Sequence, residues 1–195
     1  MRVVAGKYGG RKLAAPKGRG VRPTLEKVRE AVFDSLGPRF EGASVLDLFA
    51  GSGAMGFEAL SRGAARVVFV DSEQRSLDAV RQNAAALKVV ERSISLMALT
   101  ASAAIRSLAS KKERFDVVFV DPPWESGIYE QTLLELGLSG IVDPDGIVVV
   151  EHARRYPVDA VHGPLVMTRD RTYGDACVAY FRIASAANEP RQVED

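Results

Sequence analysis

The sequence predicts an α/β protein built on a doubly wound, mostly parallel sheet, and two observations carry this prediction. From residue 44 onward, short apolar runs alternate with longer segments of helical periodicity, which is the rhythm of strand–helix–strand units. The runs are apolar at consecutive positions, as expected of strands that helices cover on both faces. With 195 residues and 47% hydrophobic content, the chain is long enough for one domain with a substantial core.

The elements can be assigned in order along the chain. The segments "RVVAG" and "RKLAAP" flank "KYGG" and predict a small hairpin with a glycine turn. A helix is expected from Thr24, a fair N-cap after Pro23, to the stop at Gly37 and Pro38. Strands are then expected at 44–49, 66–71, 93–97, 115–121 and 146–152, and helices at 54–62, 73–87, 101–109 and 128–138.

The last third of the chain departs from this rhythm. The stretch "PLVMTRDRTYGDACVAYFRI" predicts two strands joined near residues 173–175, so the sheet is expected to end in an antiparallel pair. We therefore divide the chain into a basic hairpin and helix at 1–40, a main domain at 41–185 and a disordered tail at 186–195.

Charge is distributed unevenly along the chain. Residues 1–40 hold ten Lys or Arg and three acidic residues, a net charge of +7, whereas the whole chain carries only +1. A basic segment on an acidic body indicates a polyanionic partner such as RNA, and a merely solvated basic surface is the alternative. The expected RNA contacts are Arg2, Lys7, Arg11, Lys12, Arg19, Arg22 and Arg29.

Several classes of protein are excluded by composition. No window approaches ~18 apolar residues, so no transmembrane helix is expected, and the N-terminus lacks the apolar region of a signal peptide. Cys177 stands alone, which indicates a small buried thiol in a reducing cytoplasm.

His152 at a strand end predicts a polar partner, and His162 is expected in a loop. No metal site is expected, because neither histidine has a second histidine or a cysteine cluster near it in sequence.

Two expected strands end in residues suited to a nucleoside-containing cofactor. The first is followed by "DLFAGSGAMG", in which Gly51 and Gly53 let the backbone approach a ligand closely and the next helix offers free N–H groups. The second ends at Asp71, 20 residues after Gly51, where a carboxylate can accept hydrogen bonds from ribose hydroxyls. Capping of the following helix is the alternative role for Asp71.

The end of the strand at 115–121 distinguishes among such cofactors. The sequence Asp121-Pro122-Pro123-Trp124 has no role in a dehydrogenase that transfers hydride. It resembles the (D/N)-P-P-(F/Y/W) motif of S-adenosylmethionine-dependent amino-group methyltransferases. The Asp121 carboxylate and the Pro122 carbonyl, whose direction the Pro-Pro unit fixes, can accept the two N–H groups of a weakly nucleophilic exocyclic amine. Trp124 offers a face on which a flipped-out base can stack. The methyl group is already activated on a sulfonium, so positioning supplies most of the catalysis.

Beyond this motif, the chain resembles the RsmD family over about residues 2–183. The resemblance rests on "RPTLEKVREAVFDSL", "VLDLFAGSGAMGFEALSRGA", "FDVVFVDPPW" and "YGD", in that order. RsmD proteins are bacterial methyltransferases that act on the exocyclic N2 of a guanine in 16S rRNA of the small ribosomal subunit. The resemblance implies a Rossmann-like class I methyltransferase sheet of seven strands with the last antiparallel, S-adenosylmethionine as donor and 16S rRNA as partner. Independently of the resemblance, we expect a monomeric cytoplasmic protein that does not associate with a membrane.

The resemblance assigns roles to individual residues. It places the donor at Asp47, Ala50, Gly51, Ser52, Gly53, Asp71, Ser72 and Leu99, and the guanine at Asp121, Pro122, Pro123 and Trp124. The sequence departs from the family twice. Trp124 stands where Tyr or Phe is usual, and the acid that family members commonly have near Leu99 or Thr100 is missing. A backbone group or the Thr100 hydroxyl would then have to contact the adenine.

Two other classes of function stay open at the level of sequence. The same short motif serves methyltransferases that act on adenine N6 or on a glutamine side chain, although the basic segment and the extent of the resemblance favour rRNA. A non-catalytic RNA-binding factor is the other class, and the intact Asp121, Gly51 and Gly53 argue against it.

Overall fold

The computed structural model describes residues 1–16, 26–123 and 127–184, which form one eight-stranded sheet in the order β3-β2-β1-β4-β5-β8-β7-β6. The strands are β1 (Ser44–Asp47), β2 (Arg66–Val70), β3 (Ile94–Met97), β4 (Phe115–Val120), β5 (Val142–Ala153), β6 (Val161–His162), β7 (Leu165–Tyr173) and β8 (Ala176–Ile183). Strands β1 to β5 pair in parallel, whereas β8 runs antiparallel to β5 and β7, and β6 runs antiparallel to β7.

The predicted α/β fold, with a doubly wound parallel sheet and an antiparallel end, is confirmed. The one strand beyond the seven expected is β6, which has only two residues. His162 lies in β6 and is buried, so its expected place in a loop was wrong. One imidazole nitrogen of His162 lies 2.8 Å from the carbonyl oxygen of Asp159, and the other lies 3.0 Å from a carboxylate oxygen of Glu130.

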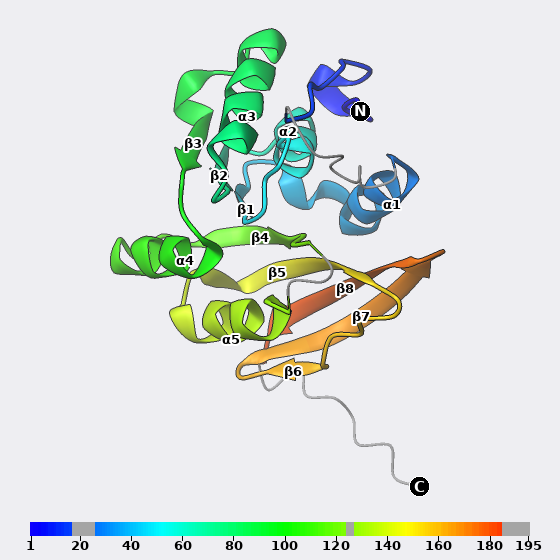
Figure 1. Cartoon of the computed structure of the whole chain (residues 1–195), viewed down its shortest axis with the longest axis vertical. Helices are drawn as coiled ribbons and strands as arrows, with labels where there is room; N and C mark the ends of the chain where they lie inside the picture. Colours follow the sequence, from blue (N-terminus) through cyan, green and yellow to red (C-terminus); the bar gives the residue numbers. More distant parts are fainter. Residues whose placement is uncertain (17–25, 124–126, 185–195) are drawn as a thin grey trace, which may run out of the picture.

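Helices cover both faces of the sheet (Figure 1). The helices are α1 (Glu26–Leu36), α2 (Ala54–Ser61), α3 (Gln74–Leu87), α4 (Ala101–Ser110) and α5 (Tyr129–Ser139), with short 3-10 turns η1 (Gly6–Tyr8), η2 (Gly37–Phe40) and η3 (Glu91–Ser93). In Figure 1, α1, α2 and α3 lie on one side of the central strands and α4 and α5 on the other. Within the described residues, no helix combines the length and the apolar character needed to cross a bilayer.

Alternation along the strands divides the interior into two cores. Val45 of β1 packs with α1, α2 and α3, whereas the next residue, Leu46, packs with α4 and α5. On β4, Val117 and Val118 divide in the same way, and all four side chains are fully buried. This two-sided burial explains why the central strands are apolar at consecutive positions.

The N-terminal segment, residues 1–16, forms the expected hairpin only in part. A single antiparallel bridge joins Arg2 to Lys12, and the turn η1 lies between them. The bridge is formed by hydrogen bonds from the N–H of Leu13 to the carbonyl of Met1 and from the N–H of Val3 to the carbonyl of Arg11, both at 3.0 Å. The N–H of Gly10 also donates to the carbonyl of Val3, at 2.9 Å. The segment is therefore a short irregular hairpin that contains a 3-10 turn, and not a regular pair of strands.

A buried carboxylate anchors this N-terminal segment to the sheet domain. Glu58 of α2 is fully buried, and its oxygens accept hydrogen bonds from the N–H groups of Val4 and Ala5 at 2.6 and 3.0 Å. Arg62 lies 2.9 Å from the same carboxylate, and the fully buried Arg29 of α1 lies 3.9 Å from it. Burial lowers the pKa of Arg29, and the charge of Glu58 opposes that effect. Glu58 thus joins α1, α2 and the N-terminal segment.

We expect Glu58→Gln to lower the free energy of unfolding by about 3–5 kcal/mol, because it leaves Arg29 buried without its counter-charge. Urea unfolding followed by circular dichroism measures this change. Asp34→Asn is the matched control, because Asp34 also pairs with Arg62, at 3.2 Å, but its side chain is 64% exposed. That control should cost no more than about 1 kcal/mol. Equal losses in the two variants would contradict the anchoring role of Glu58.

Candidate active site

The candidate site lies at the carboxyl edge of the parallel strands. Strand β1 sits between β2 and β4, so the chain builds outward in one direction through β2 and β3 and in the other through β4 and β5. In sheets of this kind, ligands bind outside the carboxyl ends of the strands where the order reverses. Asp47, Asp71 and Asp121 occupy or directly follow the ends of β1, β2 and β4, and therefore meet at this point.

The glycine-rich turn after β1 is held by backbone hydrogen bonds to both neighbouring strands. The N–H of Leu48 donates to the carbonyl of Phe119 at 3.1 Å, and the N–H of Ala50 donates to that of Val70 at 2.9 Å. Gly51 has a φ of 53°, and no atom lies within 4 Å of the place where its side chain would stand. The turn is thus held by β2 and β4, and it leaves space beside Gly51 where a ligand could approach.

Close packing of α2 on β2 depends on glycine as well. A Cβ on Gly56 would lie 2.2 Å from Cε1 of Phe69, so no larger residue fits there without displacement of the ring. Gly53, with a φ of 78°, is the N-cap of α2. The helix therefore begins directly behind the turn, with its first N–H groups near the open space.

Asp47 is a buried carboxyl group at the centre of the site. Its side chain accepts a hydrogen bond from the N–H of Gly56 at 3.1 Å. Burial raises the pKa of Asp47 to about 7, and the charges of Asp121 and Asp71 raise it further against the lowering effect of the Gly56 hydrogen bond. A group with such a pKa is poised to gain or lose a proton near neutrality, and a cationic ligand would favour its ionised form.

Asp71 uses both carboxylate oxygens on backbone donors. One accepts from the N–H of Gly51 at 2.9 Å and the other from the N–H of Glu73 at 2.8 Å. Helix α3 begins one residue later, at Gln74, so Asp71 does support its start, as the capping alternative held. Each carboxylate oxygen has a second lone pair, so these bonds leave Asp71 able to accept from a ligand hydroxyl.

The end of β4 combines a half-buried Asp121 with a buried Pro122 and an exposed Pro123. The hydroxyl of Tyr129, at the start of α5, donates towards the carbonyl of Pro122 at 3.4 Å and that of Glu151 at 3.2 Å. Burial raises the pKa of Tyr129 well above its usual value, as do the charges of Asp121 and Glu151. The hydroxyl therefore stays protonated and acts as a donor to the strand ends.

A shallow depression connects these strand ends to the helical layer. Asp121 and Glu151 lie on its polar side, and its apolar walls include Val32, Met55 and Phe119. Trp124, expected to stack on a base, lies outside the described residues.

The other residues assigned to the donor are more dispersed. Ala50 and Ser52 are buried, and the Ser52 hydroxyl donates to the sulfur of Met1 at 3.2 Å. Ser72 is exposed, and Leu99 is 36% exposed. The Thr100 hydroxyl accepts from the N–H of Ala103 at 3.3 Å as the N-cap of α4, so it already has a structural role.

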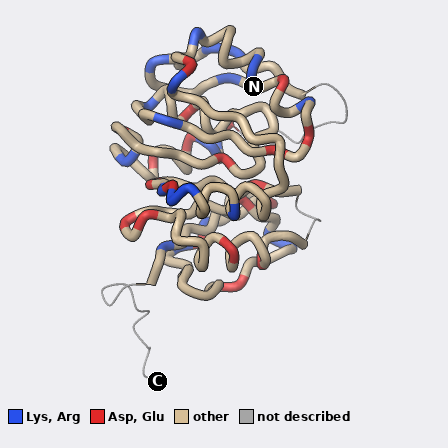
Figure 2. Tube along the Cα trace, turned by 90° about the vertical axis from the view of Figure 1, so that its left-hand side faces the viewer, with Lys and Arg blue, Asp and Glu red and all other residues tan. Residues whose placement is uncertain are grey.

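The basic residues of the N-terminal region divide into exposed and buried ones. Arg2, Lys7, Arg11 and Lys12 are all exposed, and several basic positions lie around the N-terminal end of the molecule in Figure 2. The expected RNA contact at Arg29 was wrong, because its side chain is fully buried against Glu58. The expected contacts Arg19 and Arg22 lie outside the described residues.

Two residues that support the candidate site were not predicted from the sequence. Asn83 on α3 is buried, and its amide donates to the carbonyls of Ser52 and Ala14 at 2.9 and 3.0 Å. It links the glycine-rich turn to the N-terminal segment. The available signal was a polar side chain on the apolar face of α3. Tyr129 is the second, and its place five residues after Trp124 gave no comparable signal.

Comparison with known proteins places this geometry in a family. A family model described as "Conserved hypothetical protein 95" matches residues 1–182. Ribosomal RNA small subunit methyltransferase D of Escherichia coli (strain K12) is 34% identical over 180 residues, which are 92% of this chain and 87% of that protein. The chain belongs to the RsmD family of methyltransferases. YlbH of Bacillus subtilis (strain 168) is 37% identical over 93% of this chain and 98% of its own length.

Solved structures agree with the class I methyltransferase fold. The hypothetical protein TTHA0928 of Thermus thermophilus superposes with a TM-score of 0.81 and 27% identity, over 94% of this chain and 99% of that one. SMU.776, solved in complex with SAH (S-adenosylhomocysteine), has a TM-score of 0.65 over 80% of this chain and 48% of that one. At 14% identity, the second likeness concerns the fold alone.

We expect Asp47→Asn to flatten the dependence of stability on pH. An unfolded Asp titrates near ~4, so between about 4 and about 7 the folded wild type binds more protons than the unfolded chain. The free energy of unfolding of the wild type should therefore fall as pH rises through this interval. The variant lacks the titrating group but keeps an oxygen for the Gly56 N–H. Denaturant unfolding at a series of pH values measures both slopes.

Asp116→Asn provides the control for this experiment. Asp116 is exposed on β4 and accepts a hydrogen bond from the N–H of Ser44 at 2.8 Å, at the opposite end of the strands. This variant should keep the slope of the wild type, and a wild-type slope in Asp47→Asn would contradict the perturbed pKa.

Proposed function

We propose that this RsmD-family protein transfers a methyl group from S-adenosylmethionine to the exocyclic N2 amine of a guanine in 16S rRNA of the small ribosomal subunit. The observation that carries the proposal is the adjacency of two strand ends. One bears the glycine-rich turn and Asp47, and the other bears Asp121 and Pro122. The Escherichia coli relative is named as a small-subunit rRNA methyltransferase, which supports the choice of small-subunit rRNA as substrate.

The residues at the first strand end fit the proposed donor. S-adenosylmethionine would supply a methyl group that is already activated on a sulfonium. Asp47 would accept hydrogen bonds from the cationic amino group of the methionine part, and the open face of Gly51 leaves room for that part beside the backbone. Asp71 would accept from ribose hydroxyls with its remaining lone pairs.

The residues at the second strand end fit the proposed acceptor. The lone pair of an exocyclic amine is delocalised into the base, so the amine must be polarised before it attacks. Asp121 and the carbonyl of Pro122 would each accept one N–H of the amine, which draws the nitrogen towards tetrahedral geometry. Tyr129 supports this arrangement, because its hydroxyl bridges the carbonyls of Pro122 and Glu151. The proton released after transfer would pass to Asp121 or to water.

The target base would have to leave its helix to reach this site. Base flipping is the general solution for enzymes that modify a base, and an aromatic face commonly stabilises the extruded base. We propose that Trp124 provides this face and that the exposed Arg2, Lys7, Arg11 and Lys12 hold the surrounding phosphates.

Asp121→Ala should reduce methyl transfer by about 10²-fold or more, because one of two acceptors that polarise the amine is lost. The measurement is incorporation of labelled methyl from S-adenosylmethionine into 16S rRNA, with nucleoside analysis after digestion. We expect N2-methylguanosine as the product, and donor affinity within a few-fold of the wild type. Asp116→Ala, at the far end of the same strand, is the control and should keep full activity. N6-methyladenosine as the product would overturn the proposed substrate.

Replacing Lys7 and Lys12 by Ala should weaken RNA binding and reduce its dependence on salt. Each lost phosphate contact lowers the slope of log affinity against log salt by ~0.7–0.9, because fewer counterions are released. The control replaces Lys111 and Arg114, which are exposed at the amino end of β4 and carry the same charge. Equal slopes in both double variants would refute the proposed contacts. Substitution is preferable to truncation, because residues 1–16 also anchor to Glu58 and Asn83.

A further inference from the structure

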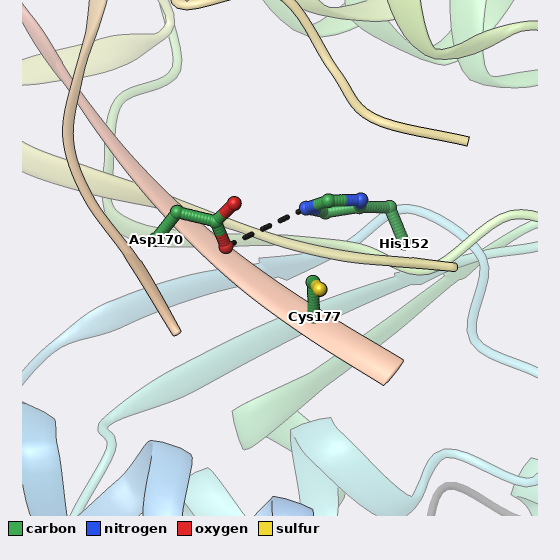
Figure 3. A group of neighbouring side chains, drawn as sticks. All are labelled: His152, Asp170 and Cys177. Atoms are coloured by element: carbon green, nitrogen blue, oxygen red, sulfur yellow. Dashed lines mark ion pairs between the residues drawn. The ribbon is translucent and has the colours of Figure 1, made fainter. Parts of the chain in front are cut away.

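Three side chains with metal-binding chemistry meet on the antiparallel side of the sheet (Figure 3). His152 comes from β5, Cys177 from β8 and Asp170 from β7. One nitrogen of His152, the sulfur of Cys177 and one carboxylate oxygen of Asp170 all lie within 4.8 Å of one another. These residues lie outside the proposed donor and acceptor sets.

Strand register explains why these three residues converge. His152 and Cys177 are directly opposite each other in the antiparallel pair of β5 and β8. On the other side of β8, Asp170 lies opposite Ala179 and Thr172 lies opposite Cys177. Side chains two residues apart on a strand share a face of the sheet, so Asp170 and Cys177 project to the same side.

The three side chains differ in their access to solvent. His152 is only 2% exposed and Cys177 only 4%, whereas the Asp170 side chain is 40% exposed. The group therefore has two buried members and one at its solvent-facing side. An ion could enter past Asp170 and meet the imidazole and the thiol beneath it.

Hydrogen bonding defines which nitrogen of His152 is available. Nδ1 lies 3.2 Å from the carbonyl oxygens of both Ala153 and Tyr156. Carbonyl oxygens only accept hydrogen bonds, so Nδ1 carries the proton and the neutral ring has its lone pair on Nε2. Among the described residues, the buried Nε2 has no hydrogen-bond partner, and it faces Oδ1 of Asp170 at 3.6 Å. In the neutral ring this lone pair faces a carboxylate oxygen, and a cation bound to both atoms would relieve their repulsion.

We propose that His152, Asp170 and Cys177 form a site for a divalent transition-metal ion of the zinc class. Imidazole nitrogen, thiolate sulfur and carboxylate oxygen are the ligands that Zn²⁺ takes in proteins, at ~2.0–2.3 Å. Nitrogen and oxygen ligands of a tetrahedral Zn²⁺ at such bond lengths are roughly 3.3–3.5 Å apart. The 3.6 Å between Nε2 and Oδ1 is close to this separation. The second hydrogen bond of His152, through Nδ1 to backbone carbonyls, is the usual support of a metal-bound imidazole.

The same geometry argues against a nucleophilic cysteine triad. In such a triad the acid orients the histidine through the nitrogen that points away from the nucleophile. Here Asp170 lies at Nε2, and Nδ1 is already held by two backbone carbonyls. Asp170 therefore lies where a second metal ligand would be, and not where an orienting acid would be.

Metal binding at this site has a defined balance of charge. The ion replaces the proton of the Cys177 thiol, so one proton is released for each ion bound. A thiolate, a carboxylate and a neutral imidazole then neutralise the two positive charges, and water can take the fourth position. The bound ion would join β5, β7 and β8 one residue beyond Glu151, which lines the depression beside Asp121.

The test is titration of the full-length metal-free protein with Zn²⁺ by calorimetry and with Co²⁺ by absorption spectroscopy. We expect one ion per chain and a cobalt–thiolate charge-transfer band. Asp170→Asn and Cys177→Ser should each weaken Zn²⁺ binding by more than the ~10–100-fold typical of losing an outer-shell partner. Cys177→Ser should also abolish the charge-transfer band.

His162→Gln is the matched control. His162 is the other histidine of the chain, is equally buried and has a carboxylate of Glu130 at 3.0 Å, but no cysteine takes part in that contact. This variant should bind Zn²⁺ as the wild type does. Absence of saturable binding to the wild type, or equal affinity in Cys177→Ser and His162→Gln, would overturn the proposal. If Cys177→Ser fails to fold, the exposed position Asp170 decides the question alone.

Discussion

The pairing of β1 with β4 is the contact on which the rest of the molecule depends. About 70 residues separate the two strands in sequence, yet Val45 lies opposite Val117 and Asp47 opposite Phe119. Burial of each such aliphatic side chain contributes about 1.5–3 kcal/mol, and both faces of this pair are covered by helices. This burial begins two residues before Asp47, and the pairing determines where the ends of both strands lie.

Those strand ends concentrate negative charge. Asp47, Asp71 and Asp121 lie close enough for each of the other two charges to raise the pKa of Asp47. Such a cluster is costly for the protein on its own, since like charges repel and one of them is desolvated. A ligand with positive charge at this position relieves both costs, and the amino group and sulfonium of the proposed donor are of that kind. The repulsion that lowers the stability of the protein without ligand would therefore increase its affinity for the proposed donor.

Much of the fold could be predicted from the sequence, because burial on both faces leaves a plain pattern of consecutive apolar residues. The helix after β1 could also be placed, because Gly51 and Gly53 mark the turn directly before it and are a local signal in the sequence. The errors concern contacts between residues distant in sequence. Arg29 was counted as a surface charge, since nothing near it reveals its partner Glu58. Likewise His152 and Cys177 become neighbours only through strand register, so the sequence offered no sign of their meeting.

The buried carboxylate of Glu58 has a consequence for the order in which the chain matures. Val4 and Ala5 are synthesised more than fifty residues before their acceptor Glu58, and Asn83, which holds Ala14, is made later still. Residues 1–16 can therefore dock only after α2 and α3 have been synthesised. Until then Glu58 stays hydrated, and residues 1–16 have only the few hydrogen bonds within their own segment to stabilise them.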